Sequence, residues 1–179
     1  VLPFRAEFGK SFRFTEKKEK PFADISGKWE VTFWSDSSKA IGEFVQNKNN
    51  LKGTFLTPTG DYRYMEGTVQ NDSVFLSCFD GSHAFLFKAK INADKTLSGE
   101  WWSGIHHHEE WTAKRNENFS LPNPDTLTFL KKGFEKISFS FPNIDSKIVS
   151  LEDGRYKNKV VIVQILGTWC PNCMDESDF

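Results

Sequence analysis

The sequence predicts a mainly β protein, an antiparallel meander closed as a barrel or packed as a sandwich, with an α/β segment after it. Between Ile25 and about Arg115, apolar residues alternate with polar ones, as in strands that bury one face. Turn-forming segments interrupt this pattern roughly every ten residues, which is typical of short strands in a sandwich or barrel. Aromatic residues make up 15% of the chain, with 18 Phe and 6 Trp, and favour a ring-packed β core.

The individual strands follow from this alternation. In residues 27–33, GKWEVTF, the side chains of Trp29, Val31 and Phe33 share one face. The same pattern recurs in KAIGEFVQ, LKGTFLT, DYRYMEGTV, SVFLSCF, HAFLFKAKI, TLSGEWW and HHEEWTAK. The breakers between them are NKNN, TPTG, QND, FDGS, NADK and SGI. They are hairpin turns rather than helical crossovers, so residues 1–118 are expected to form one antiparallel β-domain. LPFRAEF and SFRFTE are candidates for one or two further strands.

The pattern changes after this domain. Residues 119–136 are rich in Pro and Asn at their start and are predicted to be a linker, with a short helix capped by Asp125 and ended by Gly133. KISFSF and KIVSLE predict two strands. Residues 159–166, KVVIVQIL, form a nearly continuous β-branched run, typical of a strand covered on both faces. Residues 137–179 are therefore expected to belong to a second domain.

Composition excludes some partners. The formal net charge is −1 and charged residues make up 26% of the chain, which gives no electrostatic reason to expect nucleic acid or an anionic membrane. The chain has no apolar run long enough to span a bilayer, and its start lacks the order of a signal peptide. A membrane anchor is expected only if residues precede Val1.

The three cysteines, Cys78, Cys170 and Cys173, are an odd number with one CxxC pair, which makes a structural disulfide framework a poor explanation. The segment GTWCPNC follows the predicted covered strand and leads into a predicted helix. A thiol at a helix N-terminus is stabilised as the reactive thiolate. We therefore expect Cys170 to attack a disulfide and Cys173, one turn later, to resolve the mixed disulfide.

The segment VVIVQILGTWCPNCMDE, preceded by FSFPNIDSKIVSLEDGRYKNK, resembles the TlpA/ResA-type thiol-disulfide oxidoreductases of the thioredoxin superfamily. The resemblance covers roughly Ile137–Phe179. It implies that Trp169 flanks the site, that Cys170 is the nucleophile and that Cys173 is its partner. It also implies that Glu176 matches an acidic residue that tunes the thiol pKa values and proton transfer.

The meander is similar to the β-domain, lipocalin-like in its predicted architecture, that precedes the redox domain in TlpA-like envelope proteins of Bacteroidetes-type bacteria. The likeness lies in GKWEVTF, GTFLTPTGDYRYMEG and FDGSHAFLFKAKI. It implies a location in the cell envelope or periplasm, protein thiols or disulfides as substrates, and an upstream redox donor protein. A thioredoxin fold needs further strands, helices and a cis-proline loop after its CxxC helix, so residues 137–179 are expected to be its truncated N-terminal part.

The predicted function is therefore thiol-disulfide exchange in the full-length parent, with the β-domain binding a substrate or partner and with no cofactor. The alternative is a non-catalytic β-barrel module that binds a ligand or protein. A third possibility is that the β-domain spaces or dimerises the redox domain.

Metal binding is the competing explanation for two motifs. The CxxC pair would need further zinc ligands, and the candidates are His83, His106, His107, His108 and Cys78. In IHHHEEW, the side chains of His106, His108 and Glu110 share one strand face. That face continues to Thr112 and Lys114, so a solvent-facing polar strand exterior is the favoured interpretation.

The remaining conspicuous residues are predicted to fill the core. Cys78 lies on an alternating strand and is expected to pack as a small buried hydrophobe. An aromatic stripe is expected in the core, with a ligand cavity inside a barrel as its alternative; its members are Trp29, Phe33, Phe85, Phe87, Trp101 and Trp111.

Overall fold

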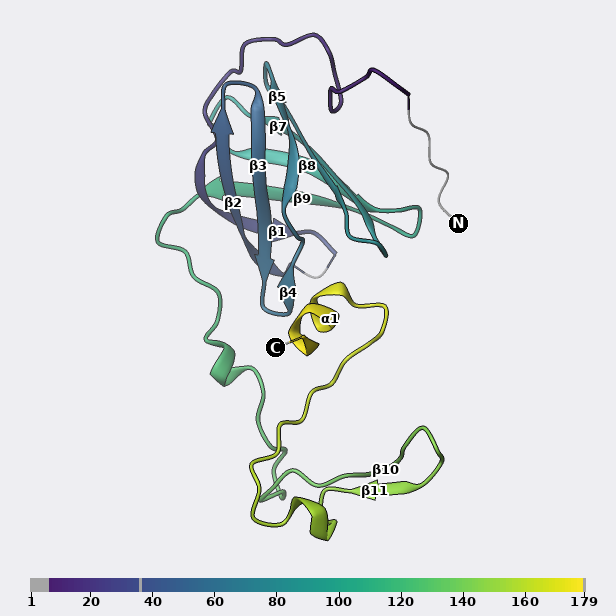
Figure 1. The fold of residues 1–179 in the computed structure, drawn as a ribbon. Helices are drawn as coiled ribbons and strands as arrows, with labels where there is room; N and C mark the ends of the chain where they lie inside the picture. The colour runs from purple at the N-terminus through teal and green to yellow at the C-terminus, as the bar shows by residue number, and fades with distance from the viewer. Residues whose placement is uncertain (1–6, 36, 179) are drawn as a thin grey trace. The chain divides into compact units, whose positions relative to one another are not determined.

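A computed structural model describes residues 7–35 and 37–178 (Figure 1). The chain divides into two compact units. The first contains the residues up to Leu121 together with those from Thr168 onward, and the second contains Pro122–Gly167.

The first unit is built on an antiparallel barrel (Figure 1). Its strands are β1 (Gly27–Phe33), β2 (Lys39–Asn47), β3 (Asn50–Thr57), β4 (Gly60–Asp61), β5 (Met65–Gln70), β6 (Ser73–Phe79), β7 (Ala84–Ile91), β8 (Leu97–Ser103) and β9 (His107–Arg115). Each long strand pairs with its neighbour in the chain, and β1 also pairs with β9, so eight strands close into a ring. The two residues of β4 extend the β3 hairpin. The mainly β prediction is confirmed, and the barrel is the alternative that forms.

The first strand closes the barrel. On one side Val31 lies opposite Ala40 of β2, and on the other it lies opposite Ala113 of β9. Trp29, Val31 and Phe33 are all buried, as their period-two spacing predicted. A slip of one residue in either pairing would turn these side chains outward, so the buried face fixes the register on both sides.

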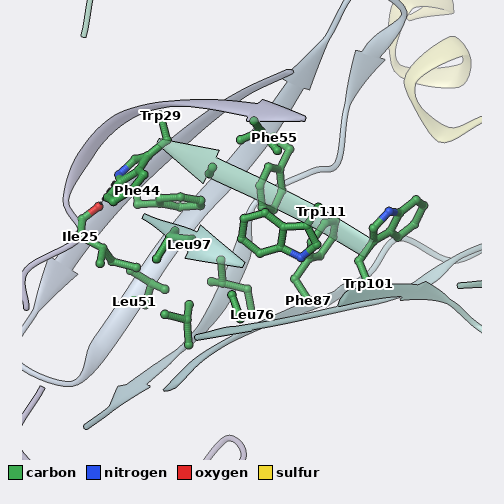
Figure 2. Close-up of a cluster of buried hydrophobic side chains, with 14 of the residues drawn as sticks. Ile25, Trp29, Phe44, Leu51, Phe55, Leu76, Phe87, Leu97, Trp101 and Trp111 are labelled. Carbon is green, nitrogen blue, oxygen red and sulfur yellow. Dashed lines mark hydrogen bonds between the residues drawn. The ribbon is translucent and has the colours of Figure 1, made fainter. Parts of the chain in front are cut away.

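Aromatic rings fill the middle of the barrel (Figure 2). The ring of Phe55 lies at its centre, 4.4 Å from Phe87 and 5.3 Å from Trp111 between centroids. The indole N–H of Trp29 donates a 2.8 Å hydrogen bond to the carbonyl of Ile25. The predicted aromatic stripe is confirmed as core except at Phe85, which is only partly buried and packs against the cluster from its edge.

Two local predictions in the β-domain are wrong. The predicted strand DYRYMEGTV is broken, because Arg63 has a left-handed φ of 62° that turns the chain between β4 and β5. In SFRFTE no strand forms. Most of LPFRAEF falls on residues 1–6, outside the described residues.

The second unit contains one short hairpin, in which β10 (Ser140–Pro142) pairs with β11 (Ile148–Ser150). Two 3-10 turns, η1 (Pro124–Thr126) and η2 (Gly154–Tyr156), are its other regular elements among the described residues. The predicted helix is wrong beyond η1, which is capped by the side chain of Asn123 rather than by Asp125.

Residues 159–166 do not form the predicted covered strand. Val160 is 96% exposed and Ile165 is 94% exposed. A strand needs a neighbouring strand for its backbone N–H and C=O groups, and no strand of the described chain pairs with this segment in a sheet. The one α-helix of the described chain is α1 (Pro171–Ser177), in the first unit. None of the described helices has the length and apolar character needed to cross a membrane.

Replacing the central ring should destabilise the barrel strongly. Phe55 is 0% exposed, so Phe55→Ala removes its ring contacts and leaves a cavity. We expect a loss of about 3–5 kcal/mol in the free energy of unfolding, measured by urea denaturation. Phe79→Ala is the control, because Phe79 is 67% exposed and its replacement should change stability by less than about 0.5 kcal/mol. Equal effects of the two changes would contradict the assigned core.

The ionisation of Glu30 should make the free energy of unfolding depend on pH in the acid range. A hydrogen bond from Asn116, with ion pairs to Lys39 and Lys114, lowers the pKa of Glu30 to about 2. A carboxylate with a lowered pKa stabilises the fold above its unfolded value, 4.5, and that contribution disappears as the pH falls through the folded value. Glu30→Gln should therefore flatten the fall in unfolding free energy between about pH 4.5 and pH 2. Glu110→Gln, on an exposed residue of β9, should keep the original slope.

Candidate functional site

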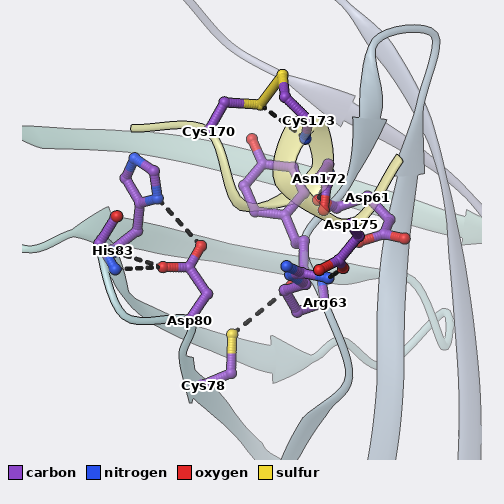
Figure 3. Close-up of polar contacts among 11 residues, drawn as sticks. Asp61, Arg63, Cys78, Asp80, His83, Cys170, Asn172, Cys173 and Asp175 are labelled. Carbon is purple, nitrogen blue, oxygen red and sulfur yellow. Dashed lines mark hydrogen bonds and ion pairs between the residues drawn. A yellow bond between two sulfur atoms is a disulfide. The ribbon is translucent and has the colours of Figure 1, made fainter. Parts of the chain in front are cut away.

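The two cysteines of the CxxC motif lie at the start of α1 (Figure 3). Cys170 is the N-cap residue with an extended backbone, and Pro171 occupies the first turn, where its missing N–H leaves no hydrogen bond unmade. The Sγ of Cys170 accepts a 3.3 Å hydrogen bond from the backbone N–H of Cys173. The two residues form a disulfide, with 5.3 Å between their Cα atoms. Both are partly exposed, so another thiol can approach them.

The other two predicted site residues lie on either side of this pair in the chain. Trp169 is 72% exposed beside Cys170. Glu176 is exposed on the last turn of α1, and within the described residues its carboxylate has no hydrogen bond or ion pair with the cysteines. The tuning role of Glu176 therefore stays a prediction.

Asp175 is the acidic residue of α1 that contacts the barrel (Figure 3). It forms an ion pair with Arg63, whose hydrogen bond holds the pKa of Asp175 below its usual range. The side-chain amide of Asn172 donates a 3.2 Å hydrogen bond to the carbonyl of Asp61. A Cβ on Gly60 would lie 2.8 Å from that amide, so the glycine permits this close approach. These contacts join α1 to the connection between β3 and β5.

A pocket of about 600 Å³ opens at the same end of the barrel. Its walls come from the end of β3, the start of β7, the end of β8 and the start of β9. Trp169 and Asn172 line it as well. The residues on either side of Cys170 and the open end of the barrel therefore share one pocket. Its other lining residues are Ser35, Thr57, Thr59, Gly60, Asp61, Tyr62, His83, Phe85, Trp101, Ser103, His107 and Glu109.

Glu109 supplies an inward-facing carboxylate to this pocket. Its side chain is 11% exposed; it accepts a 3.0 Å hydrogen bond from the backbone N–H of Ser35 and lies 2.9 Å from Nε2 of His107. Burial by itself raises the pKa of Glu109, but the hydrogen bonds from Ser35 and His107 outweigh it and lower the pKa. The carboxylate is therefore ionised at neutral pH. The His107 ring also packs against Trp101, with 4.7 Å between the ring centroids.

A second histidine lines the pocket next to a buried acid. His83 lies 3.0 Å from the carboxylate of Asp80, which is 5% exposed, and its ring stacks on Phe85. Burial raises the pKa of Asp80, but hydrogen bonds from the backbone N–H groups of His83 and Ser82 lower it overall. Asp80 therefore stays ionised and holds the His83 ring against the wall.

The sequence analysis did not identify Glu109 as a site residue, although the strand alternation indicates its position. On β9, Glu109 lies on the same strand face as Trp111 and Ala113, which are buried, so its side chain is expected to face inward. The predicted exterior position of His108 is confirmed, since it is exposed and stacks on Trp102. Within residues 7–35 and 37–178, no group of three or more His, Cys, Asp or Glu side chains is placed to hold a metal ion.

Cys78 packs against the core, as predicted. It lies on β6, and its thiol donates a 3.3 Å hydrogen bond to the carbonyl of Tyr62. Burial raises the pKa of Cys78 to about 11. Since only the thiolate attacks, Cys78 is a poor nucleophile at neutral pH.

No model of a protein family, no characterised protein and no solved structure matches this chain. The residues themselves define two features. The CxxC pair forms a partly exposed disulfide, and the adjoining pocket offers the ionised carboxylate of Glu109 and aromatic walls to a bound group.

Labelling with iodoacetamide should separate Cys78 from an ordinary thiol. In the folded, oxidised chain we expect its labelling rate to rise about tenfold per pH unit up to pH 11, because the thiolate fraction grows with pH until the pKa is reached. Mass spectrometry of quenched samples gives the rate, with urea-unfolded chain as the reactive reference. A plateau near pH 8.5, roughly the value of a free thiol, would contradict the buried environment.

Proposed function

We propose that this protein is a thiol-disulfide oxidoreductase of the TlpA/ResA type that acts through Cys170 and Cys173. The observation that carries the proposal is the position of Cys170 at the N-cap of α1, within disulfide distance of Cys173. The N–H of Cys173 points at the Cys170 sulfur and would favour its anionic form, because hydrogen bonding to a charged form lowers its pKa.

In the reducing direction, the Cys170 thiolate attacks one sulfur of a substrate disulfide. The S–S bond of the substrate breaks, a mixed disulfide forms at Cys170, and the other substrate sulfur leaves as a thiolate. Cys173, deprotonated in turn, attacks the Cys170 sulfur, closes the Cys170–Cys173 disulfide and releases the second substrate thiolate. The substrate gains two electrons and takes two protons from solvent, while the protein loses two electrons. Reaction in reverse oxidises a substrate dithiol.

A purely structural role for this disulfide is less well supported. The bond joins residues only three apart in the sequence, and so short a loop gives little entropic stabilisation. Both cysteines are partly exposed, whereas a structural disulfide is better protected when it is buried. Accessibility and short spacing together favour exchange.

The family resemblance extends this proposal to location and partners. It favours the cell envelope or periplasm, where disulfides persist. Protein thiols or disulfides would be the substrates, and an upstream redox donor protein would return electrons to the Cys170–Cys173 disulfide. No cofactor is needed, because the two sulfurs carry the electron pair.

The barrel supports a second candidate function, that of a binding module. The specific observation is the pocket of about 600 Å³ at its open end. Because rings fill the middle of the barrel, a ligand would occupy the open end rather than a central cavity.

A redox titration tests the proposed function. A Cys78→Ser chain, which retains only the CxxC sulfurs, is equilibrated with glutathione or dithiothreitol buffers and its dithiol fraction is measured by alkylation and mass spectrometry. We expect a midpoint in the range of redox-active pairs, between about −270 and −120 mV. A midpoint below about −300 mV, typical of a structural disulfide, would contradict the proposal.

Two variants assign the sulfurs. Cys173→Ser should trap a mixed disulfide at Cys170 when it meets a peptide disulfide, because no resolving thiol is present. Cys170→Ser should trap much less. Equal trapping by the two variants would overturn the assignment of Cys170 as the nucleophile.

A further inference from the structure

We propose that the open end of the barrel is a specificity pocket for a basic side chain, Lys or Arg, of the polypeptide whose cysteine reacts with Cys170. This inference rests on the proposed function. It adds what that function leaves open, the chemistry by which a substrate is chosen.

The pocket lies where a bound polypeptide would reach it. Trp169 immediately precedes Cys170 and Asn172 follows it by two residues, and both line the pocket. A chain joined to Cys170 by a mixed disulfide advances only about 3.3 Å per extended residue. A side chain one or two residues from the reacting cysteine can therefore enter the pocket while the sulfurs exchange.

The charge of the lining selects a cation. Glu109 and Asp61 are the acidic residues of the described lining, which includes no Lys or Arg. The nearby guanidinium of Arg63 is already paired with Asp175. Asp80 stands behind His83, so even with both lining histidines protonated there are three carboxylates against two imidazolium groups. The pocket therefore keeps an excess of negative charge and disfavours an acidic side chain.

The walls suit the rest of a basic side chain. Tyr62 and Phe85 are partly exposed rings at the edge of the core, and the Trp169 indole is largely exposed. Aromatic faces attract ammonium and guanidinium groups and also pack against the aliphatic stem of Lys or Arg. An entirely apolar side chain would instead be placed against the ionised carboxylate of Glu109.

The test uses matched peptides that differ at one position two residues from a central cysteine, where they carry Arg, Lys, Gln or Glu. Binding is measured by calorimetry with the oxidised chain and peptides in which serine replaces the cysteine, so no exchange takes place. Exchange is measured separately as the rate at which the cysteine peptides open the Cys170–Cys173 disulfide.

We expect the Arg and Lys peptides to bind about tenfold more tightly than the Gln peptide at low salt, and the Glu peptide to bind more weakly still. The same order should appear in the exchange rates. Glu109→Gln should reduce the preference for Arg over Gln to about twofold or less, on the same scale of interaction.

Glu110→Gln is the matched control, because Glu110 neighbours Glu109 on β9 but is exposed; it should leave the preference intact. Asp61→Asn is a second pocket variant that keeps an oxygen acceptor for the N–H of Arg63, so the inference stays testable if Glu109→Gln fails to fold. It should also weaken the preference for Arg.

The outcomes separate the two proposals. Exchange at Cys170 that is equally fast with Arg and Gln peptides would overturn the specificity pocket and leave the oxidoreductase function standing. Preferential binding of Arg peptides without any exchange would contradict the oxidoreductase function, and with it the identification of the bound peptide as its substrate.

Discussion

Closure of the sheet through β1 is the constraint on which the rest of this structure depends. One strand pairs with β2 on one edge and with β9 on the other, and a closed antiparallel sheet has no free edges. In each strand, alternate side chains must then face the same barrel interior. Large rings such as Phe55, Phe87 and Trp111 fill that interior.

The same closure determines where function can reside. Trp101, a core ring at one end, and the neighbouring inward residue Glu109 line a pocket open to solvent. The helix that carries Cys170 contacts this end through Asn172 and Asp175. The CxxC pair and the pocket are thus adjacent, which is what the proposed oxidoreductase would need in order to choose its own substrates. Cys78, the third cysteine, is kept unreactive by burial.

The sequence predicts features that follow from local alternation better than features that depend on contacts between distant residues. The inward face of β1, including Trp29, follows from alternation within seven residues and was predictable. The break at Arg63 depends on one left-handed residue that composition does not reveal. Residues 159–166 have the composition of a strand, yet a strand also needs a partner. In the site, the CxxC motif was visible in the sequence. The ion pair between Arg63 and Asp175 joins residues 112 apart in the sequence, which no local pattern encodes. The inward position of Glu109, by contrast, follows from the alternation of β9 and could have been predicted.

The central claim, that Cys170 lies beside the open end of the barrel, is tested most directly by paramagnetic relaxation enhancement. A nitroxide attached to Cys170, in a chain with Cys78→Ser and Cys173→Ser, should broaden the indole N–H signal of Trp101. It should affect Trp29 far less, since Trp29 and Trp101 lie at opposite ends of the row of core rings (Figure 2) and opposite Arg115 and Glu109 of β9, respectively. For each indole, the signal intensity with the oxidised nitroxide is divided by the intensity after the nitroxide is reduced. The same ratio for Trp101 and Trp29 would contradict the claim.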